Sequence, residues 1–261
     1  VPSSAWLALE DNLFLLALRR RMFLPLPLTG NVCQACGAHA DEWGHHALSC
    51  TRSGWLKRRS TGLELAWVQV LIEAEANACH RPLLRDLAIP HVQDTDSRQL
   101  DIVAGGMPLY GGKTIVGDAT LRSPLSGAGV PHPGAASIDG ATFPGARRDK
   151  AGAYPELAQE GARHKFLVLA SEVGGRFSEE CTDLVRQLLN HKCAGATDID
   201  VQLRRLVYAR RWWGILSMAV QRAVSSNLHG GDWTAILGFA QPSAEELLCG
   251  VVCPPHESRM R

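Results

Sequence analysis

Residues 97–121 decide the fold, and they read SRQLDIVAGGMPLYGGKTIVGDATL. Two apolar runs, 100–103 and 114–121, lie on either side of glycine pairs at 105/106 and 111/112. Runs of aliphatic and β-branched residues that are separated by glycine and proline are typical of neighbouring strands. The stretch therefore predicts an antiparallel β-hairpin.

Each predicted strand carries one acidic residue, Asp101 at the head of the first and Asp118 inside the second. A carboxylate among Val, Ile and Ala is costly to bury unless it is paired or binds a cation. Two carboxylates that converge from adjacent strands suit Mg²⁺, which prefers oxygen ligands. A structural interpretation is equally open, in which the two acids cap turns or pair with Arg98 or Arg122.

Lys150 and Tyr154 follow this hairpin at a spacing of four residues, inside a predicted helix at 146–158. At that spacing two side chains share one helix face. A lysine beside a metal site can orient an attacking water and offset charge on a pentavalent phosphate. A tyrosine one turn away could hydrogen-bond the same water or phosphate.

The rest of the chain alternates helical and extended patterns. Ser3 or Ser4 could cap a first helix, and Ser60 or Thr61 a second one that ends near Ala78. Residues 123–145 are rich in Gly, Pro, Ser and Ala, which predicts a long surface loop. The other predicted elements are helices at 3–21, 178–192 and 199–228, the last with inward Leu203, Leu206, Leu216, Val220 and Val224, and a buried strand at 165–172. This order predicts an α/β domain with a mixed sheet.

A dense group of cysteine and histidine residues precedes the second helix. Zinc takes four ligands at tetrahedral corners, and C-x₂-C followed by H-x₃-C offers four. The predicted zinc ligands are Cys33, Cys36, His46 and Cys50, with His45 and then His39 as other candidates for the fourth position. Four protein ligands leave no open position, so the metal would be structural. Ordinary buried cysteines are the alternative.

Composition limits the other possibilities. The 261 residues are 46% hydrophobic, enough for a buried core, and the net charge of only +1 gives no global argument for a nucleic-acid partner. The eight cysteines lack the dense, even spacing of a disulfide scaffold, which indicates a reducing compartment. No apolar run reaches the roughly 20 residues of a membrane span, and no secretory signal is present. Cys249, Cys253 and His256 lack a fourth partner, so we expect them to bind no metal.

The order of these motifs is more specific than any one of them. C-x₂-C-G, D-x₂-G-x-H-A-L-S-C, L-D-I-V, V-G-D-A-T, K-x₃-Y and F-L-V-L-A-S-E-V-G-G-R-F follow one another. The series resembles the C-terminal region of non-LTR retrotransposon proteins, which ends in a zinc knuckle and a restriction-like endonuclease of the PD-(D/E)XK superfamily. The resemblance covers roughly residues 10–225. It implies a Mg²⁺-dependent endonuclease that nicks target DNA in the nucleus, with element RNA as a second partner.

The resemblance also implies roles for individual residues. Asp101 and Asp118 would hold Mg²⁺, Lys150 would position the water, and Tyr154 would assist. Glu64 matches an acid on the first helix of the superfamily, although Glu73 and Glu75 lie nearby.

Some positions depart from the family pattern or match it only in part. Thr120 stands where many restriction-like nucleases have their lysine, and Leu100 replaces a proline. The insert at 123–145 is longer than the family pattern suggests, which puts the placement of Lys150 in question. Glu172 matches a strand-end acid with a structural or supporting role.

Basic residues form three clusters. Lys57, Arg58 and Arg59 and the pair Arg147 and Arg148 flank the proposed site, where phosphate contacts and a solvated charged face are both open interpretations. The third cluster lies on the last helix and is more typical of an exposed amphipathic surface. It comprises Arg204, Arg205, Arg210 and Arg211, beside Trp212 and Trp213, which we expect in the core.

These patterns divide the chain into four parts. Residues 1–30 would be the helical tail of a preceding region, 31–52 the zinc knuckle, 53–230 the endonuclease domain and 231–261 an irregular tail. Because the chain begins with Val1, we expect a fragment of a longer protein that carries a reverse transcriptase. A catalytically decayed nucleic-acid-binding module and a structural scaffold are the competing hypotheses.

Overall fold

The computed structural model describes residues 5–27, 32–158, 163–194 and 198–229. Its centre is one four-stranded sheet in the order β1-β2-β3-β4. The strands are β1 (Asn77–His80), β2 (Ile102–Gly105), β3 (Thr114–Arg122) and β4 (His164–Glu172). β1, β2 and β3 are antiparallel neighbours, whereas β4 runs parallel to β3. The predicted hairpin, buried strand and mixed α/β class are therefore confirmed.

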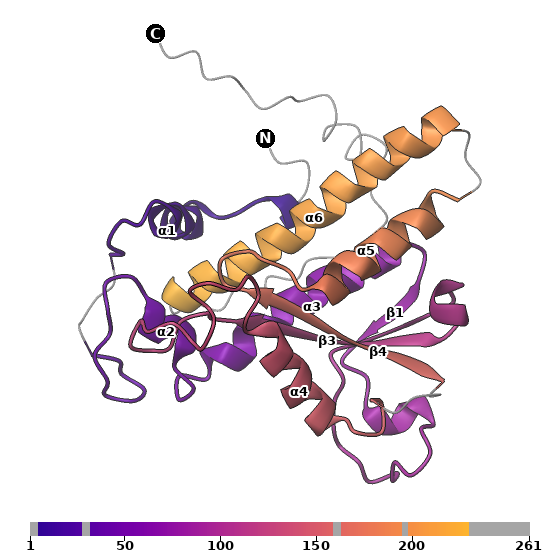
Figure 1. The fold of residues 1–261 in the computed structure, drawn as a ribbon, viewed down its shortest axis with the longest axis horizontal. Helices are drawn as coiled ribbons and strands as arrows, with labels where there is room; N and C mark the ends of the chain where they lie inside the picture. The colour runs from indigo at the N-terminus through magenta and orange to yellow at the C-terminus, as the bar shows by residue number, and fades with distance from the viewer. Residues whose placement is uncertain (1–4, 28–31, 159–162, 195–197, 230–261) are drawn as a thin grey trace.

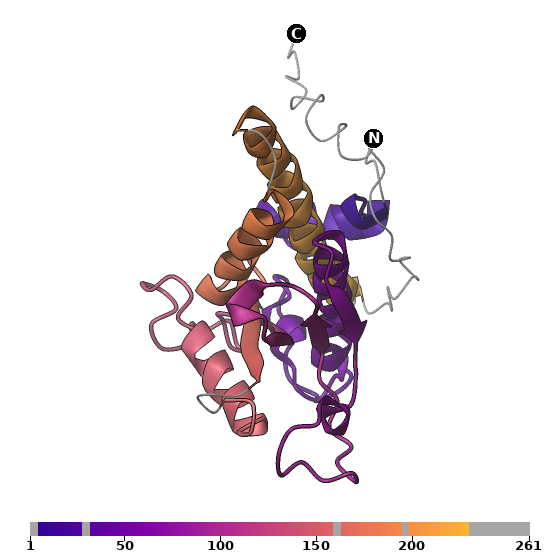
Figure 2. The ribbon, with the colours of Figure 1, turned by 90° about the vertical axis from the view of Figure 1, so that its right-hand side faces the viewer.

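Helices cover both faces of this sheet. They are α1 (Asp11–Arg21), α2 (His45–Ser49), α3 (Trp55–Glu73), α4 (Phe143–Ala153), α5 (Glu179–Lys192) and α6 (Asp198–His229), with short 3-10 turns at Ala5–Leu7, Leu84–Leu87 and Leu109–Gly111. Helix α3 packs on the sheet and against α6, and α1 packs on α6. Figures 1 and 2 show α5 and α6 crossing above the sheet and α4 below it.

Alternation along β3 assigns its side chains to two hydrophobic cores. Ile115, Ala119 and Leu121 belong to the larger core, which includes α3, α5 and α6. Val116 belongs to the smaller core beneath the sheet, together with Ala146 of α4. Because successive strand residues point to opposite faces, Asp118 faces the α4 side with Val116.

Helix α3 differs from the prediction at both ends. It begins at Trp55 after Gly54, whose φ of 74° is a left-handed conformation that suits glycine, so neither Ser60 nor Thr61 caps it. It ends at Glu73 rather than near Ala78, because Glu75 adopts a φ of 71° and turns the chain into β1. The end of the predicted helix instead belongs to the short strand β1, which pairs with β2.

The predictions for the other helices hold to different degrees. Helices α5 and α6 are confirmed within one or two residues, and Ser178 caps α5 by accepting a hydrogen bond from the Cys181 N–H. The predicted first helix begins at Asp11 instead, after Glu10, and Ser3 and Ser4 lie outside the described residues. On α6, the side chains expected to point inward include two exposed ones, Leu203 and Leu206.

The predicted loop lies within the described residues, whereas the predicted C-terminal tail does not. The loop prediction at 123–145 holds up to residue 142, because α4 begins at Phe143, earlier than expected. The tail after 230, with Cys249, Cys253 and His256, lies outside the described residues. Among the residues described, no helix is long and apolar enough to cross a membrane.

Candidate functional site

The strand register brings the two hairpin acids together. Ile102 pairs with Gly117, so one further step along the antiparallel ladder places Asp101 opposite Asp118. The Asp101 Oδ2 accepts a hydrogen bond of 2.9 Å from the backbone N–H of Ala119. Asp118 is only 2% exposed. Side chains directly opposite each other on one sheet face lie within contact distance, so the two carboxyl groups form a pair in which Asp118 is buried and Asp101 is partly buried.

Lys150 reaches this pair from α4. Its Nζ lies 2.6 Å from the Asp118 Oδ1. Helix α4 is held over the sheet at its start, where the Thr142 hydroxyl donates a 2.9 Å hydrogen bond to the buried carboxylate of Glu172. Glu172 thus supports the helix that presents Lys150, despite the long loop before it.

The arginines considered as structural partners for the two acids are engaged elsewhere. Arg98 pairs with Asp96 at 2.7 Å and with Glu156 at 2.6 Å. Arg122 pairs with Asp149 at 2.6 Å. Among the described residues neither arginine forms an ion pair with Asp101 or Asp118, whereas Lys150 contacts Asp118.

One lysine does not offset the charge of this carboxyl pair. Burial, the Asp118 charge and the Glu64 charge together raise the pKa of Asp101 to about 8. Burial also raises the pKa of Asp118, against the lowering effect of Lys150. Without a bound cation Asp101 therefore keeps its proton at neutral pH, and a divalent cation with oxygen ligands is a chemically suitable replacement for that proton.

The pKa of Asp101 predicts how stability depends on pH without Mg²⁺. A carboxyl group whose folded pKa is raised from 3.8 to about 8 stabilises the fold below about pH 4. That contribution is lost as the pH rises through about 8. Asp101→Asn carries no such charge, so the stability of this variant relative to wild type should grow between pH 5 and 8.5. Each pKa unit corresponds to about 1.4 kcal/mol, so the change should exceed about 1 kcal/mol.

Urea unfolding of zinc-loaded protein in Mg²⁺-free buffer measures this difference. Added Mg²⁺ should reduce it by compensating the Asp101 charge. An equal pH dependence in the variant and the wild type would show that Asp101 is ionised normally.

Glu64 approaches the same place from α3. Its Oε2 accepts hydrogen bonds from the His80 Nε2 at 2.8 Å and the Arg81 Nε at 3.0 Å, and its Oε1 accepts one from the Ser60 hydroxyl. Burial would raise the pKa of Glu64, but His80 and Arg81 bring it below the ordinary value. The Arg81 backbone N–H also donates to the Asp101 carbonyl at 3.0 Å. Arg81 therefore links Glu64 to Asp101, a role that the sequence analysis missed.

The two other acids considered in place of Glu64 lie apart from the site. Glu73 is fully buried against Arg211 and Trp212 of α6. Glu75 is exposed and pairs with Lys192 at 2.6 Å. Glu64 is thus the acid of this helical region that lies with Asp101.

Tyr154 lies beside the site in a different way from the prediction. Helix α4 runs from Phe143 to Ala153, so Tyr154 follows the helix instead of sharing its face with Lys150. Its hydroxyl donates a 2.8 Å hydrogen bond to the Gln99 carbonyl. Burial and the charges of Asp118 and Asp101 raise its pKa to about 12. Tyr154 is consequently a neutral donor at the edge of the site.

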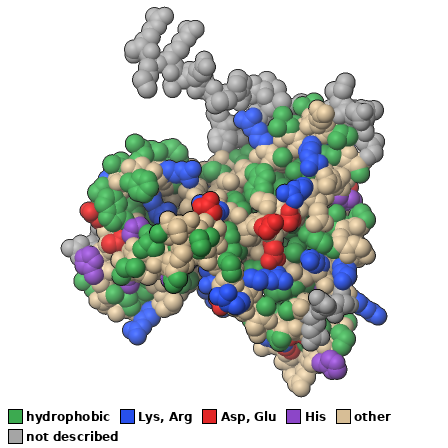
Figure 3. Space-filling view, viewed as in Figure 1, with side chains coloured by type: hydrophobic (Ala, Val, Ile, Leu, Met, Phe, Trp, Pro, Cys, Tyr) green, Lys and Arg blue, Asp and Glu red, His purple; other side chains and the backbone are tan. Residues whose placement is uncertain are grey.

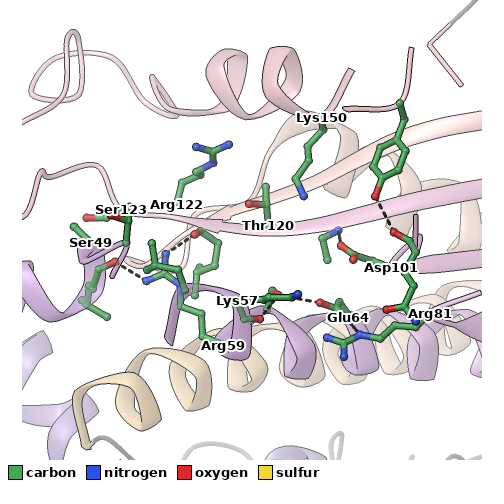
Figure 4. Close-up of a pocket in the computed structure, with 18 of the residues that line it drawn as sticks. Ser49, Lys57, Arg59, Glu64, Arg81, Asp101, Thr120, Arg122, Ser123 and Lys150 are labelled. Carbon is green, nitrogen blue, oxygen red and sulfur yellow. Dashed lines mark hydrogen bonds and ion pairs between the residues drawn. The ribbon is translucent and has the colours of Figure 1, made fainter. Parts of the chain in front are cut away.

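Glu64 and Asp101 open onto a cleft of about 870 Å³, whereas Asp118 is not among its lining residues. Figure 4 shows Lys150 reaching down from above, with Glu64, Asp101 and Arg81 at one end and Ser49, Arg59, Arg122 and Ser123 at the other. Among the described residues that line the cleft, Glu64 and Asp101 are the acids, and Lys57, Arg59, Arg81, Arg122 and Lys150 are the lysines and arginines. A cleft with basic walls and an acidic end suits an anionic substrate and a cation.

The basic residues predicted to contact phosphate differ in their exposure and in whether their side chains already have partners. Lys57 and Arg148 are exposed, and exposed Arg58 stacks over the Trp55 ring at 5.1 Å. Arg147 instead pairs with Glu180 at 2.9 Å. Of the first cluster, Lys57 lines the cleft with a side chain exposed to solvent.

Arg59 has a structural role rather than the predicted phosphate contact. It is only 6% exposed. Its guanidinium donates to the Leu48 carbonyl at 2.6 Å and to the Leu121 carbonyl at 2.7 Å, which joins α2 to β3. On α6, Arg204 and Arg210 are exposed as expected, whereas Arg211 is buried. Trp212 is in the core as predicted, and Trp213 is partly buried beside Phe177.

A second cluster lies beyond the far end of this cleft. The ligand atoms of Cys33, Cys36, His46 and Cys50 all lie within 4.8 Å of one another, so the cluster could bind a metal ion. The Cys33 and Cys50 sulfurs are 3.8 Å apart, and the Cys36 sulfur lies 3.2 Å from the His46 Nε2. Tetrahedral zinc would separate two sulfurs by about 3.8 Å and a sulfur and a nitrogen by about 3.5 Å. His46 rather than His45 or exposed His39 completes the cluster.

Two neighbouring segments fix the geometry of this cluster. The Asp41 carboxylate accepts hydrogen bonds from the backbone N–H groups of Trp43, His45 and His46, and so begins helix α2. The loop after β3 packs on the other side, where the Ser49 hydroxyl donates to the Leu125 carbonyl at 3.0 Å. The segment that carries this cluster is thereby tied to the loop that follows the sheet strand β3.

No known family model matches this chain, and no curated protein matches it in sequence.

Proposed function

We propose that this chain is a Mg²⁺-dependent DNA endonuclease domain that nicks target DNA by hydrolysis of a phosphodiester. The observation that carries the proposal is the convergence of Asp101, Asp118 and Lys150 beside Glu64. Lys150 lies 2.6 Å from Asp118, and Glu64 and Asp101 line a cleft whose other charged walls are basic. An acidic site that binds a cation and basic walls that bind phosphates are the two requirements of metal-assisted phosphodiester cleavage.

Each residue of the site has a distinct proposed role. Asp101 and Asp118 would hold the Mg²⁺, which when bound polarises the phosphate and lowers the pKa of a bound water. Glu64, held by His80 and Arg81, lies beside them as a further acid. Lys150 binds Asp118 in the resting protein and is placed to orient water or a phosphate oxygen. Tyr154 orients the Gln99 segment and offers a neutral hydroxyl at the edge of the cleft.

Two features support the wider assignment to a restriction-like nuclease of a retrotransposon-type protein. The mixed sheet flanked by helices is compatible with the fold that the motif order implies. The cysteine and histidine cluster precedes that sheet, as a zinc knuckle would. On this proposal the protein acts on nuclear DNA, with element RNA as a second partner and a reverse transcriptase in the same polyprotein.

Zinc is the metal we propose for the cysteine and histidine cluster. Three sulfurs and one imidazole nitrogen match a structural zinc site. The purified protein should contain about one zinc per chain. Cys36→Ser or His46→Ala should lose most of it, whereas His45→Ala should retain it, because His45 lies outside the cluster. Metal analysis by mass spectrometry measures this content, and zinc loss in His45→Ala but not His46→Ala would reverse the ligand assignment.

The proposed activity is tested on the intact, zinc-loaded chain with supercoiled plasmid. Mg²⁺ should convert the plasmid to nicked circles, and its omission should stop the reaction. Tight DNA binding without nicking at any Mg²⁺ concentration would overturn the endonuclease and favour a catalytically decayed binding module of the same fold. Absence of both binding and nicking would favour a structural scaffold.

A further inference from the structure

A second cavity of about 560 Å³ lies beside the segment that carries the cysteine and histidine cluster. It is formed by the end of α1, the turn that precedes α2, and the turn that follows β4. Leu125 lines both this cavity and the 870 Å³ cleft, so the two hollows border on one shared residue. The Leu125 carbonyl is fixed by the Ser49 hydroxyl, and the residue pairs with Pro131 in an isolated bridge.

The lining of this cavity combines aromatic rings with cations. Phe23 is 83% exposed and Trp43 is 37% exposed. Arg20, Arg21 and His45 line the same cavity, and no described lining residue is acidic. The nearby Asp41 carboxylate is occupied by three backbone N–H groups. Figure 3 shows hydrophobic side chains gathered over α1 on this face.

Arg20 and Arg21 supply positive charge to the cavity. One guanidinium nitrogen donates to the Val173 carbonyl at 3.3 Å, while its buried Nε has no hydrogen-bond partner among the described residues. The buried Nε is closed to solvent, so the solvent-accessible part of the Arg20 guanidinium and the exposed Arg21 are the groups that can meet an anionic ligand. Charge complementarity therefore favours a polyanion over an apolar or basic peptide.

We infer that this cavity binds unpaired nucleotides of the nucleic acid whose duplex occupies the catalytic cleft. Phe23 and Trp43 stack on bases, and Arg20 and Arg21 contact phosphates. Aromatic faces flanked by cations are the recurrent means of binding single strands without sequence preference. The strand crosses Leu125 on its way between the two hollows. The link to the cleft rests on the proposed function, whereas the single-strand site itself does not.

Binding of a fluorescent 12-nucleotide oligo(dT) by fluorescence anisotropy tests the site without any need for cleavage. The protein is zinc-loaded and full-length, in Mg²⁺-free buffer. Trp43→Ala and Phe23→Ala should each weaken binding by about 5- to 100-fold, the effect of removing one stacked base. Phe14→Ala is the matched control, because Phe14 is an α1 aromatic that is 53% exposed and lies outside the cavity.

Three outcomes would overturn the inference. The first is unchanged oligonucleotide affinity in both Trp43→Ala and Phe23→Ala. The second is an equal loss in Phe14→Ala, which would indicate a general apolar surface for a protein partner. The third is equal affinity of the wild type for oligo(dT) and for an abasic strand of the same length, because stacking requires bases.

A second measurement separates this inference from the proposed function. A nicked or blunt duplex is compared with the same duplex carrying a single-stranded extension. The extension should strengthen binding by about tenfold in the wild type but not in Trp43→Ala. Retained oligo(dT) binding with no plasmid nicking would refute the endonuclease alone, and nicking with no contribution from Trp43 or Phe23 would refute the single-strand site alone.

Discussion

Replacing Asp118 by Asn is expected to reduce Mg²⁺-dependent plasmid nicking by about 10²- to 10⁴-fold, the range for removal of one catalytic group. Asp118 lies in β3 opposite Asp101 and contacts Lys150, so it is the acid that joins the proposed metal site to the lysine. Asparagine keeps the shape of the side chain but removes its negative charge. The variant should therefore bind DNA and fold normally while the rate collapses.

The fold should survive this change for an electrostatic reason. Asp118→Asn leaves Lys150 without an ion-pair partner, yet it also removes the Asp118 charge, which adds to burial in raising the pKa of Asp101. These two effects oppose each other. Circular dichroism and thermal unfolding should place the variant close to the wild type.

Asp86→Asn is the matched control for this experiment. Asp86 is an exposed acid, 59% accessible, in the turn Leu84–Leu87 and outside the cleft. The same chemical change there should leave nicking within about twofold. Nicking by Asp118→Asn at the rate of the control would remove Asp118 from the site and with it the proposed mechanism.

Replacing Glu73 by Ala is expected to cost about 3–5 kcal/mol of unfolding free energy, the range for breaking a buried ion pair. The Glu73 carboxylate is fully buried and accepts two hydrogen bonds from Arg211, at 2.9 and 2.8 Å. It also accepts one from the Trp212 Nε1 at 3.0 Å and one from the Gln69 amide at 2.6 Å. Removing it leaves the Arg211 charge in a low-dielectric core between α3 and α6.

Glu75→Ala provides the comparison two residues away. Glu75 is 65% exposed and pairs with Lys192 on the surface. A solvent-exposed ion pair contributes only about 0–1 kcal/mol. Urea unfolding of both variants should therefore give very different losses. Similar losses would mean that the α3–α6 contact tolerates an unpaired arginine, against the expectation from burial.

The sequence could predict the sheet because its strands carry strong local patterns. The run around Val116 is rich in β-branched residues, and the run around Val168 is continuously apolar and is followed by a glycine pair. Both patterns are visible within a few residues of sequence. Strand β1, at Asn77–His80, has no such pattern. Its conformation depends on pairing with β2, a tertiary contact that local propensity does not report.

The acids of the candidate site could be predicted from the sequence, whereas the contacts that support them were harder to predict. Asp101 and Asp118 stand out because acids are rare inside apolar strands. The contact of Lys150 with Asp118 depends on how α4 folds back over the sheet after a long loop, which spacing alone leaves open. Tyr154 shows the limit of the spacing argument, because the helix ends one residue before it.

Arg81 and Arg59 show a second limit of what the sequence can predict. Both are basic residues in a sequence that offers many, and nothing local distinguishes them. Arg81 links Glu64 to the Asp101 backbone, and Arg59 uses its guanidinium on two carbonyl groups. Such roles follow from tertiary geometry, so a basic cluster in the sequence overestimates the number of cations that are free to meet phosphate.

The position of Arg59 also shows how the segment before residue 53 is connected to the rest of the chain. Burial lowers the pKa of Arg59 to about 10, and its two acceptors, Leu48 and Leu121, lie on opposite sides of the boundary drawn at residue 52/53. A chain that began at residue 53 would keep Arg59 but lose the Leu48 carbonyl, one of the two acceptors of its guanidinium. The segment that carries the cysteine and histidine cluster is therefore bonded to the larger unit through Arg59, and exchanging it for another such segment would require a carbonyl at the same place.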